Sequence, residues 1–189
     1  MNESDIASKL KSMLSPRRFQ HSLGVQNTAI ELAKLYGCNI EKASQAGLLH
    51  DCAKDLKKTQ MLQLCDNFDI VLDGISTAET QLIHGPLGAY IAREEFGIVD
   101  EEILDAIHYH TTAKEEMSLL TKIIYLADYI EPNRNFRGVK KLRAQAYRNL
   151  DSALMMALDS TLAHVMKKGR LIHPRTIDAR NYILLGMVK

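Results

Sequence analysis

The sequence predicts an all-α protein. Only ten glycines and four prolines occur among its 189 residues, so few positions interrupt regular structure. Most segments carry apolar residues at the three- and four-residue spacing of one helix face, and runs that alternate between apolar and polar residues are almost absent. We therefore expect helices throughout and no strand.

Capping residues and breaks divide the first third of the chain into helices. Ser4 can cap a short first helix, and Ser15 followed by Pro16 is a typical helix start. Asn39 can cap a third helix, and the polar stretch 54–58 connects that helix to a short fourth one. The expected helices are a short one after Ser4, then Pro16 to Gly37, Asn39 to His50 and Thr59 to Leu64.

The same signals continue to the C-terminus. Residues 66–76 have mixed signals and predict a loop or a mobile cover, and a helical pattern over residues 80–95 is interrupted at Gly85-Pro86. Pro132 should end the helix that precedes it. Further helices are expected from Asp100 to about His110, then over residues 118–130, 139–149, 151–168 and 176–188.

Length and composition indicate one intracellular domain. A chain of this size can bury one core without disulfides, so we expect a single domain over residues 1–189. Its 24 basic and 23 acidic side chains nearly cancel, which favours neither a nucleic acid nor a membrane as partner. The three cysteines form no CxxC pair and suit the cytoplasm, and no segment has the roughly 20 apolar residues of a membrane span.

An apolar stripe in the expected helix 151–168 has two interpretations. Met155, Leu158 and Leu162 lie at helical spacing and could pair two subunits in a homodimer. A stripe of methionine and leucine is more often part of a protein's own core. The sequence leaves the oligomeric state open.

Imidazole and carboxylate groups within apolar segments point to a metal site. His50 and Asp51 follow an apolar run, His21 lies in the second turn of its helix, and Asp128 lies within another apolar run. Burying such groups is costly unless a partner satisfies them, and a divalent cation can satisfy all four. Lys122 should face elsewhere, and we expect no nearby lysine or arginine to balance Asp128. Two histidines and two aspartates also leave coordination positions for water and substrate, which suits catalysis.

Two other histidines have an ordinary explanation. A single buried histidine is more often bonded to a backbone carbonyl than to a metal. We expect this for His108 and His164. Residues two apart on a helix point to different sides, so His108 and His110 should not both face the metal.

The sequence resembles the HD-domain metal-dependent phosphohydrolases, a helical superfamily whose signature is a histidine, a His-Asp pair and a distant aspartate. Longer motifs resemble its YqeK branch and extend over nearly the whole chain. They are Arg18 to Val25, Leu48 to Asp55, His84-Gly85-Pro86, Tyr109 to Thr112, Leu126 to Pro132, Ile172-His173-Pro174 and Ala179 to Tyr182. The resemblance implies an HD-type helical bundle with a metal site in its core.

The YqeK branch comprises symmetrical bis(5'-nucleosyl)-tetraphosphatases, which split diadenosine tetraphosphate into two molecules of ADP with bound iron. By this resemblance His21, His50, Asp51 and Asp128 would hold iron, and manganese or magnesium could take its place. The expected reaction is attack of a metal-activated water on a central phosphorus, with ADP as the leaving group.

Further residues could complete the catalytic site. His84 and His110 could bind a second metal through Asp51, or could donate to substrate phosphates beside a single metal. We therefore expect Asp51, Lys54, His84 and His110 to be catalytic. Arg18, Arg134 and Lys54 could contact the phosphates directly. We expect this most of Arg18, then of Arg134, and least of Lys54.

A polar segment near the C-terminus could bind the nucleoside. By resemblance, residues 169–176 fold over the nucleoside and Thr176 caps the helix that follows, although an ordinary interhelical turn would have a similar sequence. The expected nucleotide-binding residues are Arg18, His84, His110, Thr111, Arg134, His173, Pro174 and Thr176.

Two other functions fit the same ligands. One is another HD-type reaction, by a nucleotidase or a cyclic-nucleotide phosphodiesterase. The other is a non-catalytic module that senses a nucleotide and keeps the metal for folding. Lys54, His84 and His110 disfavour the second, because a structural site usually closes its coordination sphere and needs no phosphate-binding cations.

Overall fold

The computed structural model describes residues 1–188, and within that range it contains helices and no strand, as the sequence predicts. The first seven elements are α1 (Glu3–Met13), α2 (Pro16–Tyr36), α3 (Ile40–Leu49), α4 (Lys58–Asn67), α5 (Gly74–Ala78), the short 3-10 helix η1 (Thr80–Leu82) and α6 (His84–Phe96). The remaining five are α7 (Glu101–Tyr109), α8 (Leu119–Ile130), α9 (Val139–Ala146), α10 (Leu150–Lys167) and α11 (Pro174–Val188).

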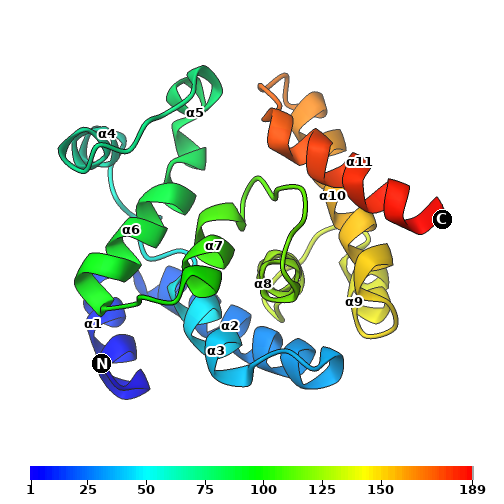
Figure 1. Ribbon diagram of the computed structural model, residues 1–189, viewed down its shortest axis with the longest axis horizontal. Helices are drawn as coiled ribbons and strands as arrows, with labels where there is room; N and C mark the ends of the chain where they lie inside the picture. The colour runs from blue at the N-terminus through cyan, green and yellow to red at the C-terminus, as the bar shows by residue number, and fades with distance from the viewer. Residues whose placement is uncertain (189) are drawn as a thin grey trace.

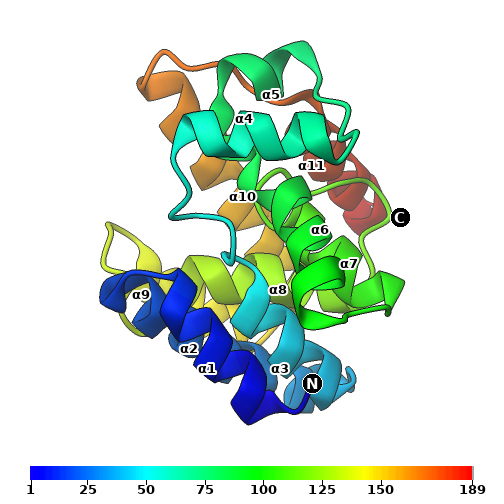
Figure 2. The same ribbon diagram turned by 90° about the vertical axis from the view of Figure 1, so that its left-hand side faces the viewer.

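Helices α6, α7 and α8 lie in the middle of the molecule, between two groups of helices. In both views α1, α2 and α3 form one end of the molecule, α4 and α5 form the other, and α6, α7 and α8 lie between them (Figures 1 and 2). Helix α2 packs against α3 and α8, and α7 packs against α6 and α8. Helices α10 and α11 pack against each other on the side that carries the C-terminus (Figure 1). This arrangement brings α2, α3, α6, α7 and α8, distant in sequence, around one interior.

Four helix starts are fixed by side-chain caps at positions where the sequence predicts a helix to begin. The side chains of Ser15, Asn39, Asp100 and Ser118 each accept a hydrogen bond from a backbone N–H in the first turn of α2, α3, α7 and α8. Such a cap satisfies a donor that has no partner within the helix. Pro132 lies two residues beyond α8, which ends at Ile130 as expected.

Three expectations for the first half were wrong. Asn2 caps α1 rather than Ser4, which lies within the first turn. Residues 66–76 are not one loop, because α4 extends to Asn67 and the side chain of Asp73 caps a further helix, α5. Gly85-Pro86 does not break α6 but lies in its first turn, where a proline's missing N–H has no cost.

The second half differs from expectation only at helix ends. Helix α9 stops at Ala146, and α10 begins at Leu150 with Asn149 as its cap. Helix α11 begins at Pro174, so Thr176 lies inside its first turn and is not its cap. Met155 and Leu158 are buried in the core, so most of the apolar stripe on α10 is core.

The interior is apolar apart from a small polar cluster. The core includes buried side chains of α1 to α4 and of α6 to α11, and the cluster buried among them consists of His21, His50, Asp51, His84 and His110. Within residues 1–188 no helix is both long and apolar enough to cross a bilayer. The buried polar cluster is therefore the feature of the fold that requires a chemical explanation.

Candidate metal centre

Four side chains from three helices meet where α3 ends. His50 is the C-cap residue directly after α3 and is fully buried, and Asp51 follows it in the turn. Nε2 of His21, from α2, lies 3.0 Å from Oδ1 of Asp128, from the last turn of α8. Nε2 of His50 lies 3.3 Å from Nε2 of His21 and 3.8 Å from the same Asp128 oxygen. The convergence of the four residues, expected from the sequence, is confirmed.

Asp51 divides the cluster into two halves. Its Oδ2 lies 3.7 Å from Nε2 of His21 and 3.5 Å from Nε2 of His50. Its Oδ1 lies 3.2 Å from Nε2 of His84 and 3.5 Å from Nε2 of His110. We call His21, His50, Asp128 and Oδ2 of Asp51 the first half-site, and His84, His110 and Oδ1 of Asp51 the second half-site.

The hydrogen bonds of the histidines show that the cluster suits a cation. Nδ1 of His50 lies 2.8 Å from the carbonyl of Gly47, and Nδ1 of His110 lies 2.7 Å from the carbonyl of Ile107. Nδ1 of His84 likewise meets the carbonyl of Gln81. A carbonyl only accepts, so each Nδ1 carries the proton, and in the neutral ring Nε2 presents a lone pair.

These lone pairs point at one another. Nε2 of His84 and Nε2 of His110 are 3.0 Å apart, and two unprotonated nitrogens cannot form a hydrogen bond. Burial, reinforced by the charge of Lys54, lowers the pKa of His84 to about 4 despite its contact with Asp51, so this ring is neutral near pH 7. A divalent metal resolves such a contact, because neutral imidazole and carboxylate are its ordinary ligands. The donor set therefore fits a metal site in the described part of the chain.

The two aspartates are held in their charged form. Burial alone would raise the pKa of Asp51, but its contacts with His50, His110 and His84 hold it well below its usual value. Burial opposes ionisation of Asp128 in the same way, and its contacts with His21 and Arg134 lower its pKa far more. Both carboxylates are therefore ready to bind a cation without losing a proton.

The sequence interpretation missed Glu131. This glutamate directly follows α8, is 2 % exposed, and places Oε1 3.1 Å from Nδ1 of His21. A carboxylate at this position fixes the ring so that Nε2 faces the first half-site. Gly24 on α2 makes room for it, because a Cβ added there would lie 2.6 Å from Oε2 of Glu131.

Arg143 on α9 holds the segment that carries Glu131. Its guanidinium donates to the carbonyls of Ile130, Glu131 and Arg134 at 2.6 to 2.7 Å. One side chain thus closes the turn after α8 by satisfying carbonyls that the helix leaves free. An arginine thirteen residues beyond a helix end gives no sequence signal for this role.

Three cations surround the cluster, and one of them corrects an expectation. Arg134 forms an ion pair with Asp128 and donates from Nε to the Asp128 carbonyl, so Asp128 does have a nearby countercharge. The sequence interpretation missed this pair because the chain reverses after α8. Nη1 of Arg18 lies 2.7 Å from Oδ2 of Asp51. Nζ of Lys54 lies 3.1 Å from Nε2 of His84, and burial lowers the pKa of Lys54.

A close contact between α6 and α7 sets the second half-site. A Cβ at Gly85 would lie 2.5 Å from the carbonyl of His108, so only glycine lets the two helices approach this closely. The contact holds His84 and His110 side by side. The buried hydroxyl of Thr111 has no hydrogen-bond partner within residues 1–188, so a donor or acceptor from a ligand could satisfy it.

The expected nucleotide residues near the C-terminus share one hollow with Thr111. Nε2 of His173 lies 2.9 Å from Oδ2 of Asp73, and the hydroxyl of Thr176 donates to the carbonyl of Thr112. His173, Thr176 and Thr111 all line a small cavity of about 50 Å³ together with Gln81, which we call the His173 hollow. Pro174 begins α11. The segment therefore lies beside the second half-site, and its nucleotide role stays a prediction.

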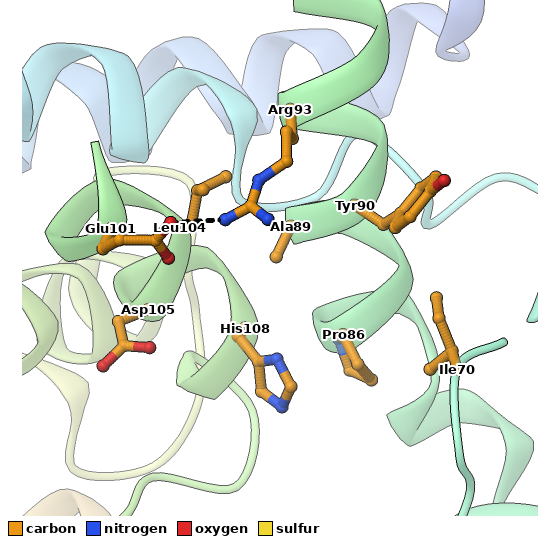
Figure 3. Close-up of a pocket in the computed structure, with 9 residues that line it drawn as sticks. All are labelled: Ile70, Pro86, Ala89, Tyr90, Arg93, Glu101, Leu104, Asp105 and His108. Carbon is orange, nitrogen blue, oxygen red and sulfur yellow. Dashed lines mark hydrogen bonds and ion pairs between the residues drawn. The ribbon is translucent and has the colours of Figure 1, made fainter. Parts of the chain in front are cut away.

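The other two histidines are not part of the cluster. His108 lines a separate cavity of about 230 Å³ between α6 and α7, opposite Pro86 and Tyr90 (Figure 3). Burial, followed by the charge of Arg175, lowers its pKa to about 4. His164 is exposed on α10, so the expectation that it would be buried was wrong. His110 faces inward instead of His108, as the helix geometry predicts.

Comparison with known proteins agrees with this geometry. The HD domain family model matches residues 18–133. A protein of Halalkalibacterium halodurans named symmetrical bis(5'-nucleosyl)-tetraphosphatase is 45 % identical, with 98 % of each chain covered. A Bacillus subtilis protein of the same name is 40 % identical over 98 % of this chain and 100 % of its own.

A solved structure has the same fold. The crystal structure of a predicted HD superfamily hydrolase involved in NAD metabolism from Clostridium acetobutylicum superposes with a TM-score of 0.94, at 44 % identity and 97 % coverage of both chains. The chain therefore belongs to the HD-domain family and, within it, to the proteins named symmetrical bis(5'-nucleosyl)-tetraphosphatase.

Proposed function

We propose that the protein is a metal-dependent hydrolase that cleaves diadenosine tetraphosphate symmetrically into two molecules of ADP. The observation that carries the proposal is the position of Asp51, whose two oxygens face two pairs of inward imidazole nitrogens beside Arg18, Lys54 and Arg134. A metal site surrounded by cations suits a polyphosphate. The names of the relatives from Halalkalibacterium and Bacillus supply the substrate class.

His21, His50, Asp51 and Asp128 would hold the metal, and we propose iron, with manganese or magnesium as substitutes. When bound, the metal supplies Lewis acidity toward water and phosphoryl oxygens. Hydrolysis joins the oxygen of water to a central phosphorus and breaks the bond from that phosphorus to the oxygen linking the second and third phosphates. The water's proton is released, and each product is a nucleoside diphosphate.

The chain's own residues stabilise the negative charge that develops during this exchange. Arg18 and Lys54 lie on the two sides of Asp51, so each can meet oxygens of the phosphate chain as it crosses the cluster. His84 and His110 present Nε2 lone pairs and can complete a second metal site, whereas donation to a phosphate oxygen would first require a proton on Nε2. The catalytic group is then Asp51, Lys54, His84 and His110. Lys54 offsets the developing negative charge, and Asp51 and the two histidines would hold the metal that offsets it, so no protein nucleophile is needed.

Product analysis tests the proposal. Purified protein is incubated with diadenosine tetraphosphate and iron(II), manganese or magnesium, and the nucleotides are separated by chromatography. ADP as the sole product supports symmetrical cleavage, whereas ATP with AMP would mean attack at an outer phosphorus. Tight nucleotide binding without turnover would identify a sensing module instead.

A panel of nucleotides separates the remaining HD-type reactions. Faster turnover of a mononucleotide would identify a nucleotidase, and turnover of a cyclic nucleotide would identify a phosphodiesterase. Metal analysis of protein purified without added ions tests iron directly. A first half-site that contains zinc or magnesium alone would contradict the iron assignment.

A further inference from the structure

A symmetrical substrate sets a geometric requirement, which rests on the proposed function. If the central bond is broken at the metal, one nucleoside diphosphate must extend from the cluster in one direction and the second in another. The protein should therefore have two hollows that leave the cluster from different sides. The expected nucleotide residues near the C-terminus supply only one of them.

The His173 hollow adjoins the second half-site. It is lined by Thr111, next to His110, and by Gln81, whose carbonyl meets the ring of His84. The unpartnered hydroxyl of Thr111 lies on this side of the cluster. One half of the substrate can therefore leave the cluster past His84 and His110.

A second hollow adjoins the first half-site. It has a volume of about 410 Å³ and is lined by Arg17, Arg18, Gln20, His21 and Arg134, among others. We call it the arginine hollow. Because His21 belongs to the first half-site, this hollow leaves the cluster from the side away from His84 and His110.

The lining of the arginine hollow suits a charged nucleotide. Arg18 and Arg134 form ion pairs with Asp51 and Asp128, which directs both guanidinium groups to the metal end of the hollow. Arg17 and Gln20 are exposed farther along the lining. Guanidinium groups bind phosphate through paired hydrogen bonds, and amide side chains can bind ribose or base by donating and accepting.

We propose that the arginine hollow is a second nucleotide subsite and binds the nucleoside diphosphate half that extends past the first half-site. Arg17 contacts a phosphate of this half, and Gln20 and Asn133 contact its ribose or base. The other half leaves the cluster past His84 and His110, toward the His173 hollow. The central phosphates thus lie across Asp51, between the two hollows.

The main competitor is a third hollow on the other side of Arg134. It has a volume of about 340 Å³ and is lined by Tyr129, Phe136 and His164 as well as by Asp128. Its aromatic side chains could stack on a base, but it contributes no cation besides Arg134. We favour the arginine hollow because it combines larger volume with three guanidinium groups.

Binding stoichiometry tests the subsite separately from the chemistry. Calorimetric titration of the metal-loaded protein with ADP should give two sites per chain. The double variant Arg17→Ala, Gln20→Ala should give one. Lys34→Ala, which removes an exposed cation from the last turn of the same helix, should keep two. One site in the unchanged protein, or two in the double variant, would overturn the proposal.

Turnover provides the second readout. Arg17→Ala should raise KM for diadenosine tetraphosphate about tenfold with kcat little changed, because one charge-assisted contact is lost. Loss of the second ADP site in Phe136→Ala but not in the Arg17 variant would assign the subsite to the aromatic hollow and reject ours. Absence of tetraphosphate hydrolysis in the unchanged protein would reject the proposed function, while the ADP count would still test the subsite.

Discussion

The two half-sites share Asp51 but differ in charge. In the first half-site the carboxylates of Asp51 and Asp128 face the imidazoles of His21 and His50. A third acid, Glu131, contacts the far side of the His21 ring. In the second half-site, Oδ1 of Asp51 faces both imidazoles, a ligand atom of Asp128 lies within 4.8 Å of one of His110, and the ammonium of Lys54 lies against His84. Three acids against the guanidinium groups of Arg18 and Arg134 still leave the first half-site the more negative of the two. Electrostatics therefore favour tighter metal binding in the first half-site and weaker binding, or phosphate contact, in the second.

Removing the residue that both half-sites share should have the largest effect. Asp51→Ala takes one oxygen from each half and leaves Arg18 without its partner. We expect loss of bound metal together with a fall in hydrolysis of at least about a thousandfold. Metal analysis and initial rates measure both, and circular dichroism checks that the helices remain. Normal turnover in a folded variant would disprove the metal mechanism.

Separate removal of a histidine from each half-site should have unequal effects. His21→Gln should abolish metal binding, because it breaks the half with two carboxylates. His110→Gln should leave the first metal in place and lower the rate roughly a hundredfold. Metal content per chain and kcat are compared for the two variants. Equal metal loss in both would show that the half-sites do not differ as their charges suggest.

Replacement of Glu131, which holds the His21 ring in place, should have an intermediate effect. Glu131→Gln keeps the shape of the side chain but removes its charge, and we expect metal affinity to fall at least tenfold. Competition with a chelating dye measures this affinity. Gly24→Ala should act in the same direction by displacing Glu131, whereas Gly186→Ala, where an added Cβ meets nothing within 4 Å, should not. Unchanged affinity in the Gly24 variant would separate Glu131 from metal binding.

The smallest expected effect lies beside the second half-site. Hydrogen bonds from Ser76 and the contact with His173 lower the pKa of Asp73 to about 2. Its stabilising contribution is therefore present above the ordinary value near 4 and is lost as the pH falls through about 2. Asp73→Ala should lower the free energy of unfolding by about 1 kcal/mol at pH 7.

Thermal unfolding at pH 7 measures the effect of the Asp73 change. Asp66→Ala, at an exposed position near the end of α4, is the matched control. If both variants lose equal stability, the Asp73 cap contributes nothing specific. Metal affinity of the first half-site should be the same in both.

Local chemistry explains what could be predicted from the sequence. The caps at Ser15, Asn39 and Asp100 act within one turn, so they fix helix starts from neighbouring residues alone. The four candidate ligands could be recognised because acids and imidazoles in apolar segments need a partner. Their convergence follows from helix packing, which the family resemblance supplied and spacing did not.

Contacts across the fold explain what was missed. Glu131 precedes a proline at a helix end, where a glutamate is ordinarily exposed, and only the approach of Gly24 from α2 buries it. Arg134 reaches Asp128 because the chain turns back after α8. The first turn of α6 was misjudged because a proline near a helix start resembles one at a break. Each feature that was missed depends either on contacts between residues distant in sequence or on the residue at which a helix begins.

The carbonyl contacts of His50, His84 and His110 have a consequence for biosynthesis. They fix the protonated nitrogen of each ring to the backbone, so the inward lone pairs repel one another until a cation lies between them. Metal binding then contributes to the free energy of folding as well as to turnover. The yield of folded protein and its catalytic capacity should rise together with the metal available while the chain is being made.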